Sequence, residues 1–174
     1  MPKSYSAALP VADVVLRILI VLNCLSAIPI GALLIATIVD EQWTLRALGI
    51  SPESWIAASM MGLRAVALLG LVAIPLYHMI FRRLLGIIRT VSAGDPFVAA
   101  NAERLQAIAW VLLVLQLLGI VIGIIGKAIS TPENPVHLNA GFSTTGWLAV
   151  LLTFVLAGIF AEGARMRDDL EGTV

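Results

Sequence analysis

The residue whose type and position could support chemistry inside this chain is Arg64, because it lies between two stretches of apolar residues. An arginine at the centre of a bilayer costs about 2.5–3.5 kcal/mol on insertion scales, so a buried one indicates an ion or ligand site. The alternative is that Arg64 lies at the membrane boundary and extends its guanidinium outward, to Asp40 or Glu41. Since Ala65–Phe81 can cross a membrane without it, we expect the boundary position.

Groups that catalysis or metal binding would need are sparse. No carboxylate occurs from Ser54 to Gly94, and no Cys/His/Asp cluster has the spacing of metal ligands. His78 and His137 are expected on opposite sides of the membrane, so they cannot share a metal ion. No serine or threonine is paired with a base. We expect a protein that is not an enzyme and holds no cofactor or metal.

A few polar side chains lie within the apolar stretches. They can form hydrogen bonds between helices, which is their ordinary use, or they can line a polar pathway. These side chains are Asn23, Cys24, Ser26, Gln116 and Thr153. Arg64 and Gln116 are therefore the candidates for an intramembrane or boundary polar site.

Four apolar stretches must position these groups, at residues 16–39, 63–81, 107–126 and 145–161. The mean hydropathy is +1.00 and 60% of the residues are hydrophobic. A bilayer core about 30 Å thick needs about 20 helical residues, and its backbone groups must be satisfied within each span. The sequence predicts an all-α, polytopic membrane four-helix bundle, with cytoplasmic helix extensions and a single domain over residues 1–174.

The basic residues predict the orientation. Eight Lys and Arg residues fall at the two termini and in the middle connection, and two fall in the other connections, Arg64 being left out. The eight are Lys3, Arg17, Arg82, Arg83, Arg89, Arg104, Arg165 and Arg167, and the two are Arg46 and Lys127. By the positive-inside rule, both termini and the middle connection are cytoplasmic.

Prolines and small residues predict how the spans bend and pack. Pro29 and Pro75 lie inside the first two spans, where a proline removes a backbone hydrogen bond and bends the helix. Gly119 and Gly123 have GxxxG spacing in the third span, which permits a close helix contact. We expect them to pack against Ala27 and Gly31 of the first span.

The connections carry their own signals. Ser51-Pro52-Glu53 predicts a helical approach to the second span, beside the interfacial residues Trp43 and Trp55. Asp95-Pro96 predicts the start of the third helix, directly after a helix end at Gly94. Residues 136–139 alternate like a short strand. The fourth helix is expected to continue through Leu170.

Two cytoplasmic segments form a candidate docking surface. If Asp95-Pro96 begins a helix, Phe97 and Asn101 share one of its faces. Phe97 would then pack against Met166 or Leu170, with Asn101 and Arg104 bonding the acidic tail. The candidate residues are Asp95, Pro96, Phe97, Asn101, Arg104, Arg165, Arg167, Asp168 and Asp169. The same contacts could equally serve only to tie the bundle together.

These segments carry a family resemblance over nearly the whole chain. The Gly94-Asp95-Pro96-Phe97 turn is followed by Asn101, Arg104-Leu105, Ile108-Ala109-Trp110 and Gln116, and the chain closes with Phe160-Ala161-Glu162-Gly163 and the tail from Arg167 to Val174. This pattern resembles the four-span bacterial family catalogued as domain of unknown function 2975. The resemblance implies a bacterial plasma-membrane protein without an established activity. Because genes of that family often neighbour small helix-turn-helix repressors of the Cro type, it also implies a membrane-bound regulatory role.

Two functions follow from these observations. The first is a regulatory or sensor subunit that acts through the GDPF turn and the RDDLEGTV tail. The alternative is a small transporter or channel-like protein for a small or amphiphilic molecule, which would use Arg64 and the proline-bent helices. The missing intramembrane acids favour the first. The expected partners are the lipid bilayer and a cytoplasmic helix-turn-helix regulator, without direct nucleic-acid binding, and a homo-oligomer stays open.

Overall fold

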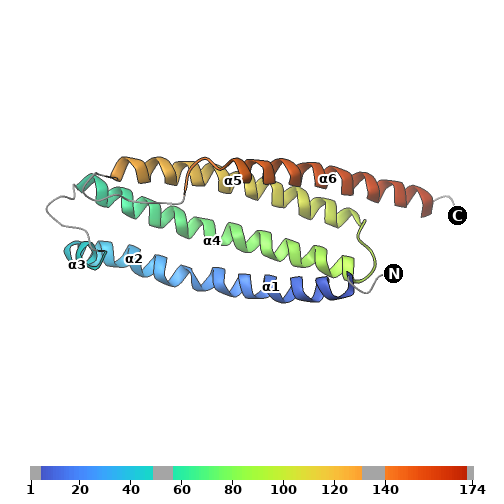
Figure 1. The fold of residues 1–174 in the computed structure, drawn as a ribbon, viewed down its shortest axis with the longest axis horizontal. Helices are drawn as coiled ribbons and strands as arrows, with labels where there is room; N and C mark the ends of the chain where they lie inside the picture. Colours follow the sequence, from blue (N-terminus) through green and yellow to red (C-terminus); the bar gives the residue numbers. More distant parts are fainter. Residues whose placement is uncertain (1–4, 49–56, 131–139, 172–174) are drawn as a thin grey trace. The chain divides into compact units, whose positions relative to one another are not determined.

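The computed structural model describes residues 5–48, 57–130 and 140–171, and these residues are helical apart from short connections (Figure 1). They form α1 (Tyr5–Leu25), α2 (Ala27–Val39), α3 (Glu41–Ala47), α4 (Ala57–Ser92), α5 (Ala99–Ile129) and α6 (Thr144–Glu171). No strand occurs in these ranges, so the all-α prediction is confirmed. The expected strand at 136–139, the helix start at 51–53 and Trp55 lie outside the described residues.

Four helical segments are long and apolar enough to cross a membrane, and each contains or closely overlaps one predicted span. They are Ala8–Val39, Ser59–Ser92, Ala99–Ile129 and Thr144–Leu170. At 1.5 Å per residue, even the shortest, with 27 residues, exceeds the 30 Å of a bilayer core. The chain buries between 0% and 22% of the residues in their most apolar windows. Because so much apolar surface is left uncovered, water is a poor solvent for this fold and lipid a good one.

The first span is interrupted near its middle. Ser26 separates α1 from α2, three residues before Pro29. A proline lacks the N–H that would bond the carbonyl four residues earlier, here that of Leu25, which is the last residue of α1. The helix therefore breaks at the hydrogen bond that Pro29 was expected to remove. Pro75 differs, because α4 continues through it without a break.

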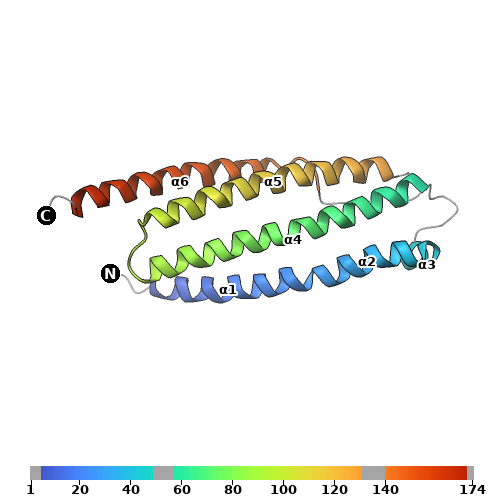
Figure 2. The ribbon, with the colours of Figure 1, turned by 180° about the vertical axis from the view of Figure 1, so that it is seen from behind.

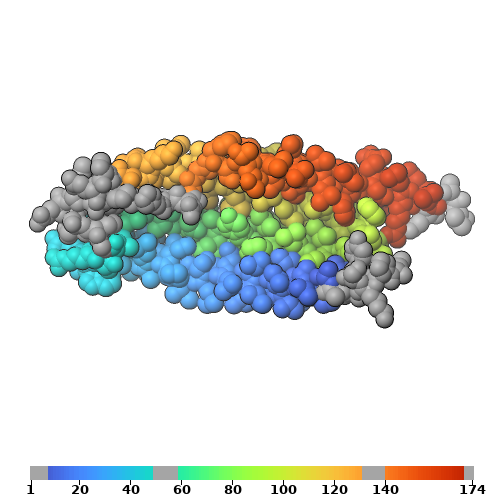
Figure 3. Space-filling view, in the orientation of Figure 1, coloured from blue at the N-terminus to red at the C-terminus, as the bar shows by residue number. Residues whose placement is uncertain are grey.

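In the space-filling view, α1 and α2 present side chains at the surface along the visible face (Figure 3).

Glycine ends α4. Gly94 has φ +87°, a left-handed conformation that suits a residue without Cβ. The Gly94 N–H donates to Val91 O and the Asp95 N–H to Thr90 O, both at 3.0 Å. These two bonds are the Schellman arrangement, which satisfies carbonyls that a helix end leaves open. The predicted helix end at Gly94 is confirmed.

The predicted helix start at Asp95-Pro96 is wrong. Residues 95–98 are not helical, and α5 begins at Ala99. The physical reason lies in competing partners: the Asp95 carboxylate pairs with Arg167, and Pro96 O accepts from Asn101 Nδ2 at 2.9 Å. We call residues Gly94–Val98 the Gly94 turn.

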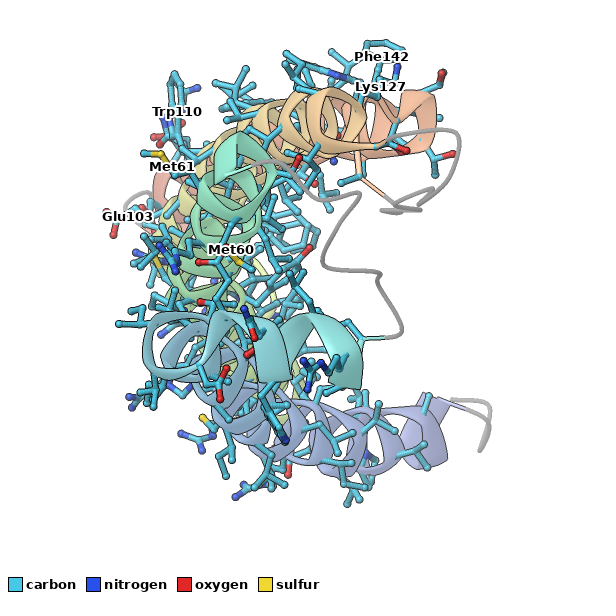
Figure 4. The ribbon with its side chains drawn as sticks, turned by 90° about the vertical axis from the view of Figure 1, so that its left-hand side faces the viewer. Met60, Met61, Glu103, Trp110, Lys127 and Phe142 are labelled. Atoms are coloured by element: carbon cyan, nitrogen blue, oxygen red, sulfur yellow. The ribbon has the colours of Figure 1, made fainter. Side chains whose placement is uncertain are left out.

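The chain divides into two compact units. The first comprises Met1–Asn23, Leu76–Val114 and Thr144–Val174, and the second comprises Cys24–Pro75 and Leu115–Ser143. In the first unit, the N-terminal half of α5 lies beside α6 in both views (Figure 2). Its core consists of small and branched residues, among them Ala109, Ile108 and Ala164, each at most 4% exposed. The second unit buries Met60, which is 1% exposed and points inward in Figure 4.

Packing in the second unit corrects the predicted GxxxG contact. A Cβ at Gly123 would meet Gly141 Cα at 2.7 Å and Ala140 O at 2.8 Å, so these glycines face the segment that leads into α6. Gly31 has no neighbour within 4 Å of its Cβ position, and α2 instead approaches α4 through Ile30 and Gly70. The prediction that Gly31 meets Gly119 and Gly123 is therefore wrong. Small residues indicated a close approach correctly but did not identify what approaches.

Candidate functional site

A buried asparagine links the end of α4 to the start of α5. Asn101 is fully buried, and its Nδ2 donates to Thr90 Oγ1 at 2.7 Å as well as to Pro96 O. The Thr90 hydroxyl donates in turn to Ile87 O at 2.8 Å. A buried amide left without partners would cost several kcal/mol in an apolar setting, so these bonds fix the side chain. Asn101 thus holds the Gly94 turn against α4.

Arg104 completes this network. Its Nη1 donates to Asn101 Oδ1 at 2.8 Å and to Gly86 O at 3.2 Å. Gly86 leaves room for the Arg104 side chain, since a Cβ at this position would lie 3.0 Å from Arg104 Nε. A guanidinium with several donors in a fixed fork can bridge a backbone carbonyl and a side-chain amide in this way. Arg104 therefore ties α5 to α4 through its head group.

Phe97 fastens the Gly94 turn to α6. Its ring centroid lies 5.3 Å from that of Phe160, at an interplanar angle of 39°. A Cβ on Gly163 would come within 2.7 Å of Phe97 Cδ1, so the ring occupies the space that the glycine leaves. Phe97 nevertheless remains 44% exposed. One side of the ring is packed and the other is available at the surface.

An ion pair makes a second link between the same segments. Arg167 Nη1 pairs with Asp95 Oδ1 across 72 positions of the chain, and both side chains are about 40% exposed. Arg165 pairs with Glu162 at 2.6 Å, as its spacing predicted, with both side chains more than half exposed. Half-exposed pairs of this kind are each worth about 0–1 kcal/mol. The Asp95–Arg167 pair therefore orients the end of α6 more than it stabilises the fold.

The structure joins the two predicted docking segments through Asp95, Arg167 and Phe97, but several of the predicted contacts differ. Phe97 and Asn101 do not share a helix face: Phe97 precedes the helix and packs on α6, whereas Asn101 points to α4. Phe97 meets Phe160 and Gly163 of α6, whereas Met166 and Leu170, the two predicted partners, are 56% and 72% exposed. The predicted bonds from Asn101 and Arg104 to the acidic tail are also wrong, because both side chains are used at α4 and the Gly94 turn. The reason is the later start of α5, which rotates this segment relative to the expected register.

Arg64 lies beside the end of α2. Its Nη2 donates to Thr37 O, one of the last carbonyls of α2, and lies 3.5 Å from Glu41 Oε2. Those carbonyls have no partner within their own helix, and the helix dipole favours a cation there. The predicted contact with Glu41 is confirmed. Asp40, the other predicted partner, instead caps α3 by accepting from Trp43 N at 2.8 Å.

The remaining polar candidates described by the structure include Gln116 in α5 and Thr153 in α6. Gln116 is half-buried in α5. Thr153 Oγ1 donates to Ala149 O, one turn earlier in α6, at 2.7 Å. Within the described ranges, no three His, Cys, Asp or Glu side chains lie close enough to hold a metal ion. His137 falls outside those ranges.

Sequence reasoning missed several residues of this site. Thr90, Gly86 and Thr37 each supply a hydrogen-bonding atom to a named candidate, and Gly163 supplies space for Phe97. A signal existed for the two glycines, since a glycine inside a long helix costs about 1 kcal/mol and commonly marks a close approach. Nothing in the local sequence marks Thr90 or Thr37, because their partners lie on other turns or helices.

Comparison with known protein families gives a match over most of the chain. The family model described as "Protein of unknown function (DUF2975)" matches residues 37–174. Neither the curated proteins nor the solved structures contain a significant match to the chain.

Proposed function

Since the chain belongs to the DUF2975 family of proteins of unknown function, we propose from its geometry that it is a non-enzymatic integral membrane protein that acts as a regulatory or sensor subunit. The observation that carries this proposal is the double link between the Gly94 turn and α6. Phe97 packs into the space at Gly163, and Asp95 pairs with Arg167. Two segments far apart in sequence thereby form one surface, whose aromatic and charged side chains are held in place by these contacts.

The exposed groups of this surface support partner docking. Arg165 and Asp168 are exposed on α6, and Phe97 is 44% exposed. Aromatic side chains and arginines are enriched at protein interfaces, and charged groups at the rim favour a partner of complementary charge. The partner that we propose is a cytoplasmic regulator of the helix-turn-helix type, contacted on its protein surface and not through nucleic acid.

We further propose that the protein lies in a bacterial plasma membrane with both termini cytoplasmic. The eight-to-two distribution of Lys and Arg supports this orientation. Reporter fusions after Thr44 and after Asn134 should both report exposure outside the cytoplasm. Cytoplasmic signal from both fusions would overturn the orientation and, with it, the cytoplasmic docking surface.

The docking role is tested by separating binding from stability. Reversal of charge in the double variant Asp168→Lys/Asp169→Lys should abolish co-purification of the regulator from native membranes, at unchanged protein level and melting temperature. Phe97→Ala should weaken the same interaction and lower the melting temperature as well. Phe142→Ala is the matched control, since it removes an exposed ring that belongs to the other unit. A parallel loss of stability in both test variants, with the partner retained, would leave only a bundle-tying role.

The transport alternative has less support. It relied on Arg64, and the contacts of this residue with Thr37 O and Glu41 account for its position structurally. Transport activity that was lost in Arg64→Leu without loss of folding would restore that alternative.

A further inference from the structure

A groove with a volume of about 500 Å³ lies between the N-terminal part of α5 and the C-terminal half of α6. Small residues of α6 line its apolar part: Ala157, Gly158, Ala161 and Ala164. Ala157 and Ala164 are buried at its floor, whereas a Cβ at Gly158 would meet nothing within 4 Å. The volume falls within the range of about 300–1,000 Å³ that small-molecule sites occupy.

The groove is long and has distinct ends. Phe154 and Asp168 both line it, and they are about 21 Å apart along α6 at 1.5 Å per residue. Phe154 contributes an aromatic wall at one end, and Asp168 a carboxylate at the other. An extended alkyl chain fits a groove of this length whose walls are formed by small apolar residues.

The charges at the groove are unbalanced. Glu103 and Asp168 line it, and within the described residues neither carboxylate has an ion-pair partner. Arg165 also lines it, but Glu162 neutralises that guanidinium at 2.6 Å. Figure 4 shows Glu103 reaching outward on the same side of the view as Trp110. The groove therefore joins an apolar stretch to two carboxylates that have no ion-pair partner among the described residues.

We propose that this groove binds a single-chain cationic amphiphile, with its alkyl chain along the small residues of α6 and its ammonium group beside Glu103 and Asp168. Charge complementarity favours this occupant over two others. A phospholipid would bring its phosphate toward the same carboxylates and has two chains to place. A second copy of α5 and α6 would bring like charges together at Glu103 and Asp168, which opposes association. The site goes beyond partner docking, because it requires only this chain.

Trp110 provides the readout. Its ring is 55% exposed and makes an edge contact with Phe154, with centroids 5.3 Å apart. The test uses the full chain in maltoside micelles with Trp43, Trp55 and Trp147 replaced by phenylalanine, so that Trp110 alone fluoresces. The probe is 11-bromoundecyltrimethylammonium, whose bromine quenches a tryptophan that it contacts. We expect saturable quenching by this probe and weak, linear quenching by the matched anion 11-bromoundecyl sulfate.

Variants identify the site. Glu103→Gln combined with Asp168→Asn should raise the half-saturating probe concentration about tenfold, as the loss of two surface ion pairs predicts. Ala161→Phe should abolish saturable quenching by filling the groove. Asp169→Asn is the matched control, since it removes the neighbouring carboxylate, which does not line the groove. Far-UV circular dichroism on every variant confirms that the helices are retained.

Four results would overturn the proposal. Equal quenching by the anionic probe would indicate partition into the micelle, and an equal effect of Asp169→Asn would indicate general surface charge. Preferential quenching by a phosphatidylethanolamine with brominated chains would assign the groove to a lipid. A protein concentration dependence, with dimer formation that blocks quenching, would assign it to a second copy. The binding measurement contains no regulator, so its failure leaves the proposed docking role untouched.

Discussion

Replacement of Asn101 by alanine tests whether the network at the Gly94 turn holds this part of the fold together. Asn101→Ala removes two bonds donated by Nδ2, to Thr90 Oγ1 and Pro96 O, and one accepted from Arg104. At about 1 kcal/mol net for each bond, the loss amounts to about 3 kcal/mol. Alanine recovers up to about 0.7 kcal/mol through its higher helix propensity. We expect the free energy of unfolding to fall by about 2–3 kcal/mol.

The assay is unfolding of the purified protein in mixed micelles as the mole fraction of sodium dodecyl sulfate rises, followed by circular dichroism at 222 nm. Gln106→Ala is the control, because it lies on the same helix and is exposed, so its effect should stay within about 0.5 kcal/mol. A double-mutant cycle with Thr90→Ala should give a coupling energy of about 1 kcal/mol, since the two side chains are in direct contact.

The reasoning is refuted if Asn101→Ala costs no more than the Gln106 control, or if the cycle shows no coupling. Either result would mean that the hydrogen bonds of this buried amide are replaced at no cost in the variant. A loss well above 4 kcal/mol would also contradict the estimate. It would indicate that the amide supports packing beyond its own three bonds.

Three further predictions concern backbone conformation, helix ends and close packing. Gly94→Ala should lower the free energy of unfolding by about 1 kcal/mol, because φ at this residue is +87°. Gly31→Ala, in open space within α2, should be neutral or stabilising. The same unfolding assay compares the two variants, and equal effects would contradict the strain argument. Arg64→Met should destabilise the protein more than Glu41→Gln does, because only Arg64→Met removes the bond to Thr37 O as well as the ion pair. The order of the two melting temperatures checks this prediction, and the reverse order would refute it. Gly123→Leu should lower the melting temperature, because its Cβ position is 2.7 Å from another backbone atom, and an unchanged melt would show that this face is free.

The spans could be predicted from the sequence because hydrophobic length is a local property. Each apolar stretch is bounded by charge or by turn residues, and the helices of the structure contain or overlap all four. The effect of Pro29 was also predictable, since the missing N–H acts on the carbonyl four residues before it. The contact of Arg64 with Glu41 followed from the few counter-charges within reach.

The site was less predictable because its contacts are set by competition between distant groups. Asp95-Pro96 has the residues of a helix start, but Asp95 pairs with an arginine 72 positions away, and α5 begins four residues later. This delay changes which groups Phe97 and Asn101 face. The GxxxG pair likewise predicted a close neighbour but not its identity, because the glycines meet a connecting segment and not a helix.

The position of Gly141 beside Gly119 and Gly123 has a consequence for the surrounding lipid. Gly119 lies ten residues, or about 15 Å, before the end of α5, and Gly141 with φ +134° is not helical. Non-helical backbone at the depth of a span requires protein or water for its polar groups, since hydrocarbon offers none. On this side of the molecule the hydrophobic belt is therefore shorter than α5 itself. A hydrocarbon core that reached the level of Gly141 would have to thin locally here, so a change in membrane thickness would act on this corner of the protein first.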